Sequence, residues 1–302
     1  MTAEAMAGFL GRLGHRVVRT ASCYWYDLQP RFCIAFPHPR PVSPPHEEIR
    51  HVFRAARCLG VRFVGTPDAP GWPSYALIVD DPSYDVAGLS ANARSKVRRG
   101  LRHCEVRRVE ASLARTQGRT AHADTLQRIR CRQGPYEWHR YWDAVEATPE
   151  VEVWGALREG LLVAYLVVVV VEACAEILVA RSRDDALGYY PNNALVFSAV
   201  RELVRRPGVE RVLFALESLD NADGATRFKE SMGFRRQRIR QRIVFHPLVE
   251  RLMGWQAFPR AIRALARRRA DDGFWRKLEG LLVFHGSLEA RRRGEEEAAW
   301  TS

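Results

Sequence analysis

Residues 151–181 read VEVWGALR, EG, LLVAYLVVVVV, EA, CAEILVAR, which is three apolar runs separated by two-residue breaks. Short runs rich in Val, Ile and Leu that end at small or polar residues are typical of buried strands. We therefore expect three consecutive strands joined by tight turns at Glu159-Gly160 and Glu172-Ala173.

A helix, a strand, a second helix and a last strand follow these three runs. Pro191 stands at an early helical position, Asn192 and Asn193 can cap the helix, and apolar residues recur at helical spacing up to Val204. Pro207-Gly208 ends this helix. We expect the next strand at residues 209–216, a helix at 221–232 closed by Gly233, and the last strand at 238–245.

This order of elements resembles the second half of the GNAT acyltransferase fold. Arg227-Phe228-Lys229, followed by Gly233-Phe234, is similar to the FK…GF signature of the FemAB-like branch. Residues 90–99, SANARSKVRR, resemble the basic helix that introduces the FemAB-like catalytic domain. The resemblance spans about residues 75–247 and implies an α/β (α+β) fold in which helices flank a mixed central sheet.

FemAB-like proteins carry two GNAT units, so we expect a degenerate tandem pair. The expected parts are a degenerate N-terminal GNAT-like subdomain (1–82), a catalytic domain (83–247) and a basic amphipathic helical extension with a frayed tail (248–302). Residues 38–45, HPRPVSPP, cannot form regular structure because proline removes backbone donors, and we interpret them as a loop or connector.

Length and composition narrow the class of protein. A chain of 302 residues, 47% of them hydrophobic, can bury a sizeable core. The longest apolar run, residues 161–171, is about half the length of a membrane-spanning helix. Residues 1–9 lack the basic start of a secretory signal, so we expect a cytoplasmic protein. The six cysteines form no CxxC pair and lack a histidine at ligand spacing, which predicts reduced thiols and no metal site.

The net charge of +12 comes mostly from arginine, and it favours a polyanionic partner, although arginine-rich codon usage explains the total equally well. Five cations gather on the helix expected at residues 84–102: Arg94, Lys96, Arg98, Arg99 and Arg102. Like charges at this spacing repel one another unless an anion lies opposite, so we expect a phosphate or tRNA contact. The alternative is a solvated face paired to Asp80, Asp81 and Asp85.

In a GNAT-like sheet the fourth and fifth strands splay apart, and the donor's reactive carbonyl enters between them. Here these strands are residues 174–181 and 209–216. The resemblance implies that Lys229 stabilises the oxyanion or the donor's terminal phosphate, and Glu217 is the candidate for accepting or relaying the amine proton. The alternatives are a solvated lysine and a glutamate that pairs with a nearby arginine.

The donor loop departs from that of ordinary GNAT acetyltransferases, which use a Q/RxxGxG/A sequence to bind the pyrophosphate of CoA. Residues 187–194 read LGYYPNNA, in which Pro191 lacks an amide and Tyr190 is bulky. FemAB-like enzymes also lack the loop and commonly use aminoacyl-tRNA. The donor-binding candidates are Arg181, Ser182, Tyr189, Tyr190, Asn192, Asn193, Ser218 and Phe228.

Three aromatic residues, Tyr136, Trp138 and Trp142, could line an acceptor pocket, although core packing explains their helical spacing more often. Two basic amphipathic helices, residues 248–269 and 274–284, could lie on RNA or an anionic membrane, or could pack back on the catalytic domain.

Three hypotheses follow for function. The first is an acyltransferase that moves an aminoacyl group from aminoacyl-tRNA to an amine of a cell-wall precursor or small peptide metabolite, without a bound cofactor. The second is an acyl-CoA-dependent N-acyltransferase on the same sheet. The third is an inactive GNAT-like module that binds RNA or an anionic surface.

Overall fold

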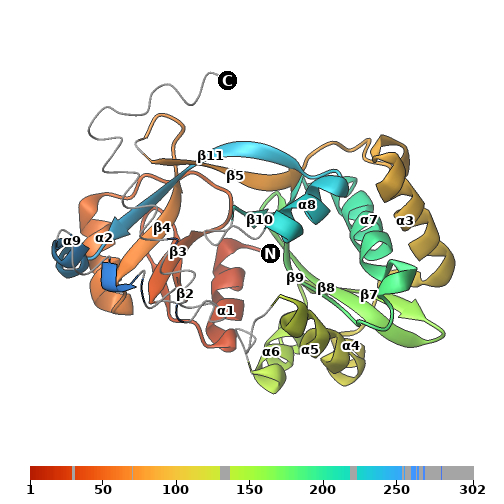
Figure 1. Ribbon diagram of the computed structural model, residues 1–302. Helices are drawn as coiled ribbons and strands as arrows, with labels where there is room; N and C mark the ends of the chain where they lie inside the picture. The colour runs from red at the N-terminus through yellow and green to blue at the C-terminus, as the bar shows by residue number, and fades with distance from the viewer. Residues whose placement is uncertain are drawn as a thin grey trace.

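The computed structural model has one mixed sheet of 11 strands, in the order β1-β2-β3-β4-β11-β5-β10-β9-β8-β7-β6 (Figure 1). It describes residues 1–28, 31–69, 71–129, 137–217, 223–253, 255, 260–262, 264, 268 and 280. The strands are β1 (Val17–Arg19), β2 (Tyr24–Leu28), β3 (Phe32–Phe36), β4 (Gly60–Gly65), β5 (Trp72–Val79), β6 (Glu105–Arg108), β7 (Val151–Arg158), β8 (Leu161–Val171), β9 (Cys174–Ser182), β10 (Arg211–Leu216) and β11 (Arg235–Phe245).

Helices cover both faces of the sheet. The helices are α1 (Ala3–Leu13), α2 (His46–Ala56), α3 (Ala91–His103), α4 (Ala111–Gln117), α5 (Arg119–Arg128), α6 (Trp138–Glu146), α7 (Pro191–Val204), α8 (Asp223–Ser231) and α9 (Pro247–Met253). One face packs against α1, α4 and α6, and the other face packs against α3 and α7 (Figure 1). The fold class expected from the sequence, a mixed sheet flanked by helices, is confirmed.

The C-terminal half has the predicted order of strand, strand, strand, helix, strand, helix, strand. The expected helix at 84–102 starts only at Ala91, because Ser90 caps it by accepting the amide of Ala93. Helices α4 and α5 meet at Gly118, where a Cβ atom would collide with the carbonyl of Ala114.

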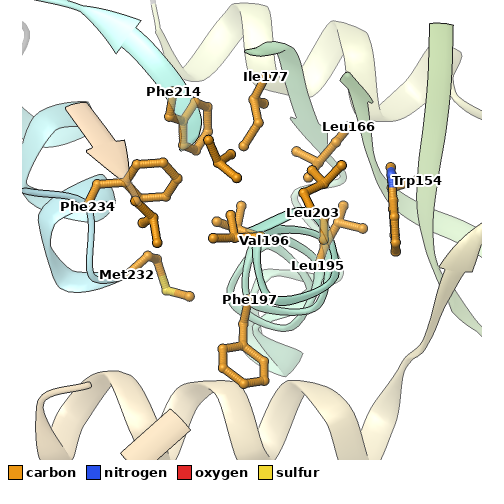
Figure 2. Packing of buried hydrophobic residues seen from close by; sticks show 14 of the residues in the cluster. Trp154, Leu166, Ile177, Leu195, Val196, Phe197, Leu203, Phe214, Met232 and Phe234 are labelled. Atoms are coloured by element: carbon orange, nitrogen blue, oxygen red, sulfur yellow. The ribbon is translucent and has the colours of Figure 1, made fainter. Parts of the chain in front are cut away.

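Helix α7 is the centre of the larger core. Its apolar side chains are almost fully buried, including Leu195 and Leu203 at 0% exposure. Figure 2 shows Val196 of α7 beside Ile177 of β9 and Phe214 of β10, with Met232 and Phe234 completing the cluster. Each such side chain contributes about 1.5–3 kcal/mol on burial, so this helix fixes the two strands relative to each other.

The N-terminal half repeats the pattern of the C-terminal half. Strands β1, β2 and β3, helix α2 and strand β4 follow one another as β7, β8, β9, α7 and β10 do. The last strands are exchanged between the halves, because β5 pairs with β10 while β11 pairs with β4, and β5 and β11 also pair with each other. This topology is that of a tandem pair of GNAT units, and the domain boundaries at residues 82 and 247 stay predictions.

Candidate active site at the fork of the sheet

Strands β9 and β10 run parallel, but they pair only at their beginnings. The paired residues are Arg211 with Cys174, Val212 with Ala175 and Leu213 with Glu176. Beyond Glu176, β9 continues along β8 as far as Ser182, whereas β10 continues along β5 as far as Leu216. We call this separation the C-terminal fork, and it lies between the two strands that the sequence predicted to splay.

Side chains on both arms of the C-terminal fork are only half-buried. Residues 178–181 of β9 and residues 215–217 at the end of β10 are all half-buried, although both strands lie in the middle of an 11-stranded sheet. Strands at such a position are usually buried on both faces. The fork therefore leaves part of the sheet accessible where a substrate could enter.

Lys229, on the last turn of α8, lies beside the C-terminal fork. Its Nζ is 4.8 Å from the centre of the Phe214 ring, and Phe214 belongs to β10. Burial lowers the pKa of Lys229 to about 8. Among the residues that the structure describes, no carboxylate lies within ion-pair distance of this ammonium group. A desolvated cation held by a ring can interact strongly with an anion that enters the fork.

Glu217 directly follows β10 and faces a polar group that the sequence did not predict. Its carboxylate accepts a hydrogen bond from Ser74 Oγ at 2.6 Å, and its carbonyl accepts one from Arg62 at 2.9 Å. Gln241 donates to the same Ser74 hydroxyl and also accepts from Arg62. Glu217 and Lys229 thus have different surroundings, and the proton-accepting role of Glu217 stays a prediction.

The end of β9 bears the two other predicted residues of that strand. Arg181 donates to His122 Nδ1 at 3.5 Å, and the His122 ring contacts Trp138 with centroids 5.3 Å apart. Burial, and then the charge of Arg181, lower the pKa of His122 to about 4, so this imidazole is neutral near pH 7. The structure thus brings a predicted donor residue close to a predicted acceptor residue.

Ser182 is fully buried and links three elements. Its Oγ accepts hydrogen bonds from Arg128 of α5 and from Asn192 of α7, both at 2.8 Å. Asn193 is also buried and donates to the sulfur of Met232. These two residues fix the start of α7 against the sheet, and any donor contact by them stays a prediction.

The start of α7 lies among aromatic rings and cations. Arg158 covers the Tyr189 ring at 3.8 Å, while Lys96 and Arg99 of α3 lie 5.7 and 5.4 Å from the centre of the Tyr190 ring. Gly100 makes this approach possible, since a Cβ atom there would lie 2.6 Å from the carbonyl of Tyr190.

Few backbone amides are available at this start of α7. Pro191 has no amide hydrogen, and the amides of Asn193 and Ala194 both donate to the carbonyl of Tyr190. The arrangement therefore differs from a glycine-rich phosphate loop, as the sequence predicted.

The remaining cations of α3 have separate roles. Arg94 donates to the carbonyls of Ala87 and Leu89, whereas Arg98 and Arg102 are exposed. The aspartates proposed as alternative partners bind elsewhere: Asp80 pairs with Arg235, Asp81 accepts from Ser83, and Asp85 pairs with Arg201 and Arg205. In the described chain, the alternative that these three aspartates pair with the cations of α3 is therefore wrong. The contact of these cations with phosphate stays a prediction.

The other predicted residues are placed as follows. Trp142 is fully buried against Tyr165, which agrees with the alternative of core packing, while Phe228 packs against the core beside α7. Tyr136, Ser218 and most of the extension after α9 lie outside the described residues. Within the described chain, no group of His, Cys, Asp and Glu residues could hold a metal ion. None of the described helices has both the length and the apolar composition needed to cross a bilayer.

Comparisons with known proteins find likeness in structure only. No family model and no curated protein matches the sequence. The solved structure of FemX superposes with a TM-score of 0.57 at 11% identity, covering 82% of this chain and 92% of FemX. L-PGS from Bacillus licheniformis gives 0.53 at 15% identity, covering 80% of this chain and 87% of its own.

A third structure is the C-terminal DUF2156 domain assigned to a lysylphosphatidylglycerol synthetase of Agrobacterium fabrum. It gives a TM-score of 0.54 at 18% identity, covering 78% of this chain and 86% of its own. The chain has the FemAB-like GNAT fold. In this fold the C-terminal fork is the position at which the sequence predicted the reaction site.

Sequence reasoning missed the polar group around Glu217 and the residue His122. A signal for Gln241 was present in the sequence. It stands two residues from both Ile239 and Ile243, and residues two apart in a strand lie on the same face. Ser74 and Arg62 gave no such signal, because their partners are more than 100 residues away in the sequence.

Proposed function

We propose that this protein is an acyltransferase that forms an amide bond at the C-terminal fork. The observation that carries the proposal is the desolvated ammonium group of Lys229 beside Phe214, at a fork whose two arms are half-buried. An attacking amine turns the donor carbonyl into an oxyanion, and a preorganised cation in a partly water-excluded site stabilises that charge.

The donor in this proposal is aminoacyl-tRNA. The acceptor nitrogen attacks the ester carbonyl, a C–N bond forms, and the bond between the carbonyl carbon and the ribose oxygen breaks. The proton leaves the amine through Glu217 and is delivered to the ribose oxygen, which departs as a hydroxyl group. The acceptor is an amine of a cell-wall precursor or small peptide metabolite. The neighbour assigned as a lysylphosphatidylglycerol synthetase is, by its name, a protein that handles an aminoacyl group.

The start of α7 favours this donor over acyl-CoA. A CoA pyrophosphate needs several free amides at a helix start, whereas Pro191 has none and the amides of Asn193 and Ala194 donate to the carbonyl of Tyr190. Lys96 and Arg99 supply positive charge at the same place, which suits the phosphates of a nucleic acid.

A donor comparison tests the proposal. The full chain is incubated with tRNA bearing radiolabelled amino acids, or separately with labelled acetyl-CoA, in the presence of a panel of di- and tripeptides with free amines. We expect labelled amide product from aminoacyl-tRNA, and formation that is about 10²–10³-fold slower when Lys229 is replaced by alanine. Product formed from the CoA thioester alone would overturn the assignment of the donor.

A further inference from the structure

Residues from four neighbouring strands form a closed ring of hydrogen bonds that includes Glu217. They are Arg62 of β4, Gln241 of β11, Ser74 of β5 and Glu217 at the end of β10, and these strands are adjacent in the sheet (Figure 1). Arg62 donates to Gln241, which donates to Ser74, and Ser74 in turn donates to the carboxylate of Glu217. A second hydrogen bond from Arg62, to the carbonyl of Glu217, closes the ring. We call Arg62, Gln241 and Ser74 the Glu217 relay.

The kinds of donor in the Glu217 relay fix the direction of its hydrogen bonds. An arginine side chain can only donate, so the atom of Gln241 that accepts from Arg62 is the amide oxygen. The amide nitrogen of Gln241 then donates to Ser74 Oγ at 2.6 Å. Because that hydroxyl accepts from Gln241, its hydrogen is directed to Oε2 of Glu217, also at 2.6 Å. The side chains of Gln241 and Ser74 therefore each have one orientation, and the Glu217 carboxylate accepts the last hydrogen bond.

The Glu217 relay is buried among apolar neighbours. Ser74 and Gln241 are 6% and 1% exposed, whereas Glu217 is half-buried. Ala76, two residues from Ser74, and Ile239, two residues from Gln241, pack in one apolar cluster. A buried hydrogen bond adds little stability compared with apolar side chains of the same shape. Stability alone therefore does not explain polar residues here, whereas a carboxylate that must keep one orientation does.

The relay supports Glu217 from the face of the sheet opposite Lys229. Ser74 alternates with Tyr75, which packs against the core around α7, so Ser74 points away from α7. Phe214, whose ring lies beside the Lys229 ammonium group, belongs to the core around α7. Lys229 and the Glu217 carboxylate thus reach the C-terminal fork from its two sides. This arrangement suits a donor whose carbonyl oxygen meets the cation while the attacking amine meets the base.

We propose that Arg62, Gln241 and Ser74 are positioning residues that hold the Glu217 carboxylate in the orientation that accepts the amine proton. This inference rests on the proposed acyl transfer and names the residues that prepare its base. As the acceptor nitrogen bonds to the donor carbonyl carbon, its proton passes to Oε1 of Glu217, while Oε2 keeps the hydrogen bond from Ser74. Glu217 then gives this proton to the departing ribose oxygen. Because Arg62 belongs to β4, the N-terminal half also takes part in the site.

A double-mutant cycle in the full chain tests this inference. Ser74→Ala removes the hydroxyl that donates to Glu217. Initial rates over a range of acceptor concentrations should show kcat lowered by about 10–10²-fold and KM for the acceptor changed by less than about threefold, because the amine still binds but meets a misplaced base.

The second arm of the cycle is Glu217→Gln, which should lower kcat by about 10²-fold because an amide cannot accept the proton. In this background Ser74→Ala should change kcat by less than about twofold, since there is no base left to position. A purely structural role of Ser74 would instead lower kcat by the same factor in both backgrounds, and that result would overturn the inference.

Gln241→Met tests whether the orientation of the Ser74 hydroxyl matters. The variant keeps a side chain of similar length but removes the donor that directs this hydroxyl to Glu217. We expect a loss in kcat smaller than that of Ser74→Ala, and no further loss in the Glu217→Gln background. A rate equal to that of wild type would remove Gln241 from the relay. Should Ser74→Ala fail to fold, Ser74→Cys keeps a weak donor and replaces it, with a smaller expected loss.

The matched control is Thr148→Val. Like Ser74, Thr148 is buried, donates to an oxygen and accepts from a side-chain nitrogen, in this case from Arg12 at 2.8 Å. The substitution should lower thermal stability about as much as Ser74→Ala does, because each removes one buried hydroxyl group, but it should leave kcat within about twofold of wild type. A control that loses as much kcat as Ser74→Ala would assign the loss to stability and not to the relay.

The inference and the proposed function can fail separately. The cycle is run with aminoacyl-tRNA and with acetyl-CoA, because the relay acts on the proton of the acceptor and not on the donor. If transfer is unchanged in Glu217→Gln, or if the two substitutions have additive effects, the relay is wrong and the acyltransferase function stands. If neither donor is turned over, the proposed function is wrong, and the relay fails with it.

Discussion

The sheet forks twice, and the two forks are used differently. In the N-terminal half, β3 and β4 pair for three residues and then separate, as β9 and β10 do. The separation is filled by the chain itself: the amide of Val42 donates to the carbonyl of Val64 at 2.8 Å, and the Val42 side chain is buried. We call this the N-terminal fork, closed by the proline-rich segment 37–45.

The C-terminal fork has a helix where the N-terminal fork has a turn. Residues 66–71 alone connect β4 to β5, whereas α8 lies between β10 and β11 and supplies Lys229. Side chains at the N-terminal fork, such as Phe36 and Val64, are buried, while those beyond Glu176 in β9 are mostly half-exposed. The same supersecondary unit thus serves once as a scaffold and once as a candidate site.

Removing a cation should lower activity far more at the C-terminal fork, by Lys229→Ala, than at the N-terminal fork. Losing the cation that meets the oxyanion should lower kcat/KM for aminoacyl transfer by about 10²–10³-fold. Arg54→Gln, which removes an exposed cation from α2 beside the N-terminal fork, should stay within about twofold. Initial rates at sub-saturating donor measure both variants. Activity of Lys229→Ala close to that of wild type would remove Lys229 from the site.

Lys229→Met should make the protein more stable while it removes activity. Burial lowers the Lys229 pKa from 10.5 to about 8, so the unfolded chain binds this proton more tightly than the folded chain. The charged lysine therefore opposes folding below pH 8. In that range the free energy of unfolding of Lys229→Met should exceed that of wild type by about 1–3 kcal/mol. The gain should shrink as pH rises from 8 and vanish above 10.5. Urea unfolding at pH 7 and pH 10.5 measures it; a gain that is equal at both would contradict the burial of a charged lysine.

The sequence predicted the C-terminal fork well because its signals are local. The runs in residues 151–181 are apolar and end at turn pairs, and the FK…GF pattern marked Lys229. The exchange of β5 and β11 could not be predicted, because alternation in a strand says which face is buried and not which strand lies beside it. For the same reason the proline-rich segment was predicted only as a loop, since its partner Val64 depends on tertiary packing.

One substitution made in both forks tests whether the N-terminal fork is filled. Val42→Thr places a hydroxyl group in the core under α2. Because this buried group loses its hydrogen bonds to water, the substitution should lower the free energy of unfolding by about 1–2 kcal/mol. Val179→Thr, on the half-buried arm of the C-terminal fork, should lower the free energy of unfolding by less than about 0.5 kcal/mol. Chemical denaturation with both variants gives the difference. Equal costs would mean that the two forks are equally closed.

The smallest effect should come from the contact that joins the two forks. His38, in the proline-rich segment, lies 3.2 Å from Glu176, the last residue of β9 that pairs with β10, and their side chains are 8% and 19% exposed. A double-mutant cycle with His38→Gln and Glu176→Gln should give a coupling of about 0.5–1.5 kcal/mol.

The same segment offers a matched pair for this cycle. Arg40 and Glu172 lie 3.3 Å apart, but their side chains are 42% and 49% exposed, so solvent should reduce their coupling to about 0.5 kcal/mol or less. If the His38–Glu176 coupling exceeds that of Arg40–Glu172, the segment that closes one fork also supports the base of the other. Equal couplings would mean that the contact between His38 and Glu176 does not stabilise the C-terminal fork. The N-terminal half would then extend the sheet without supporting the candidate site through this contact.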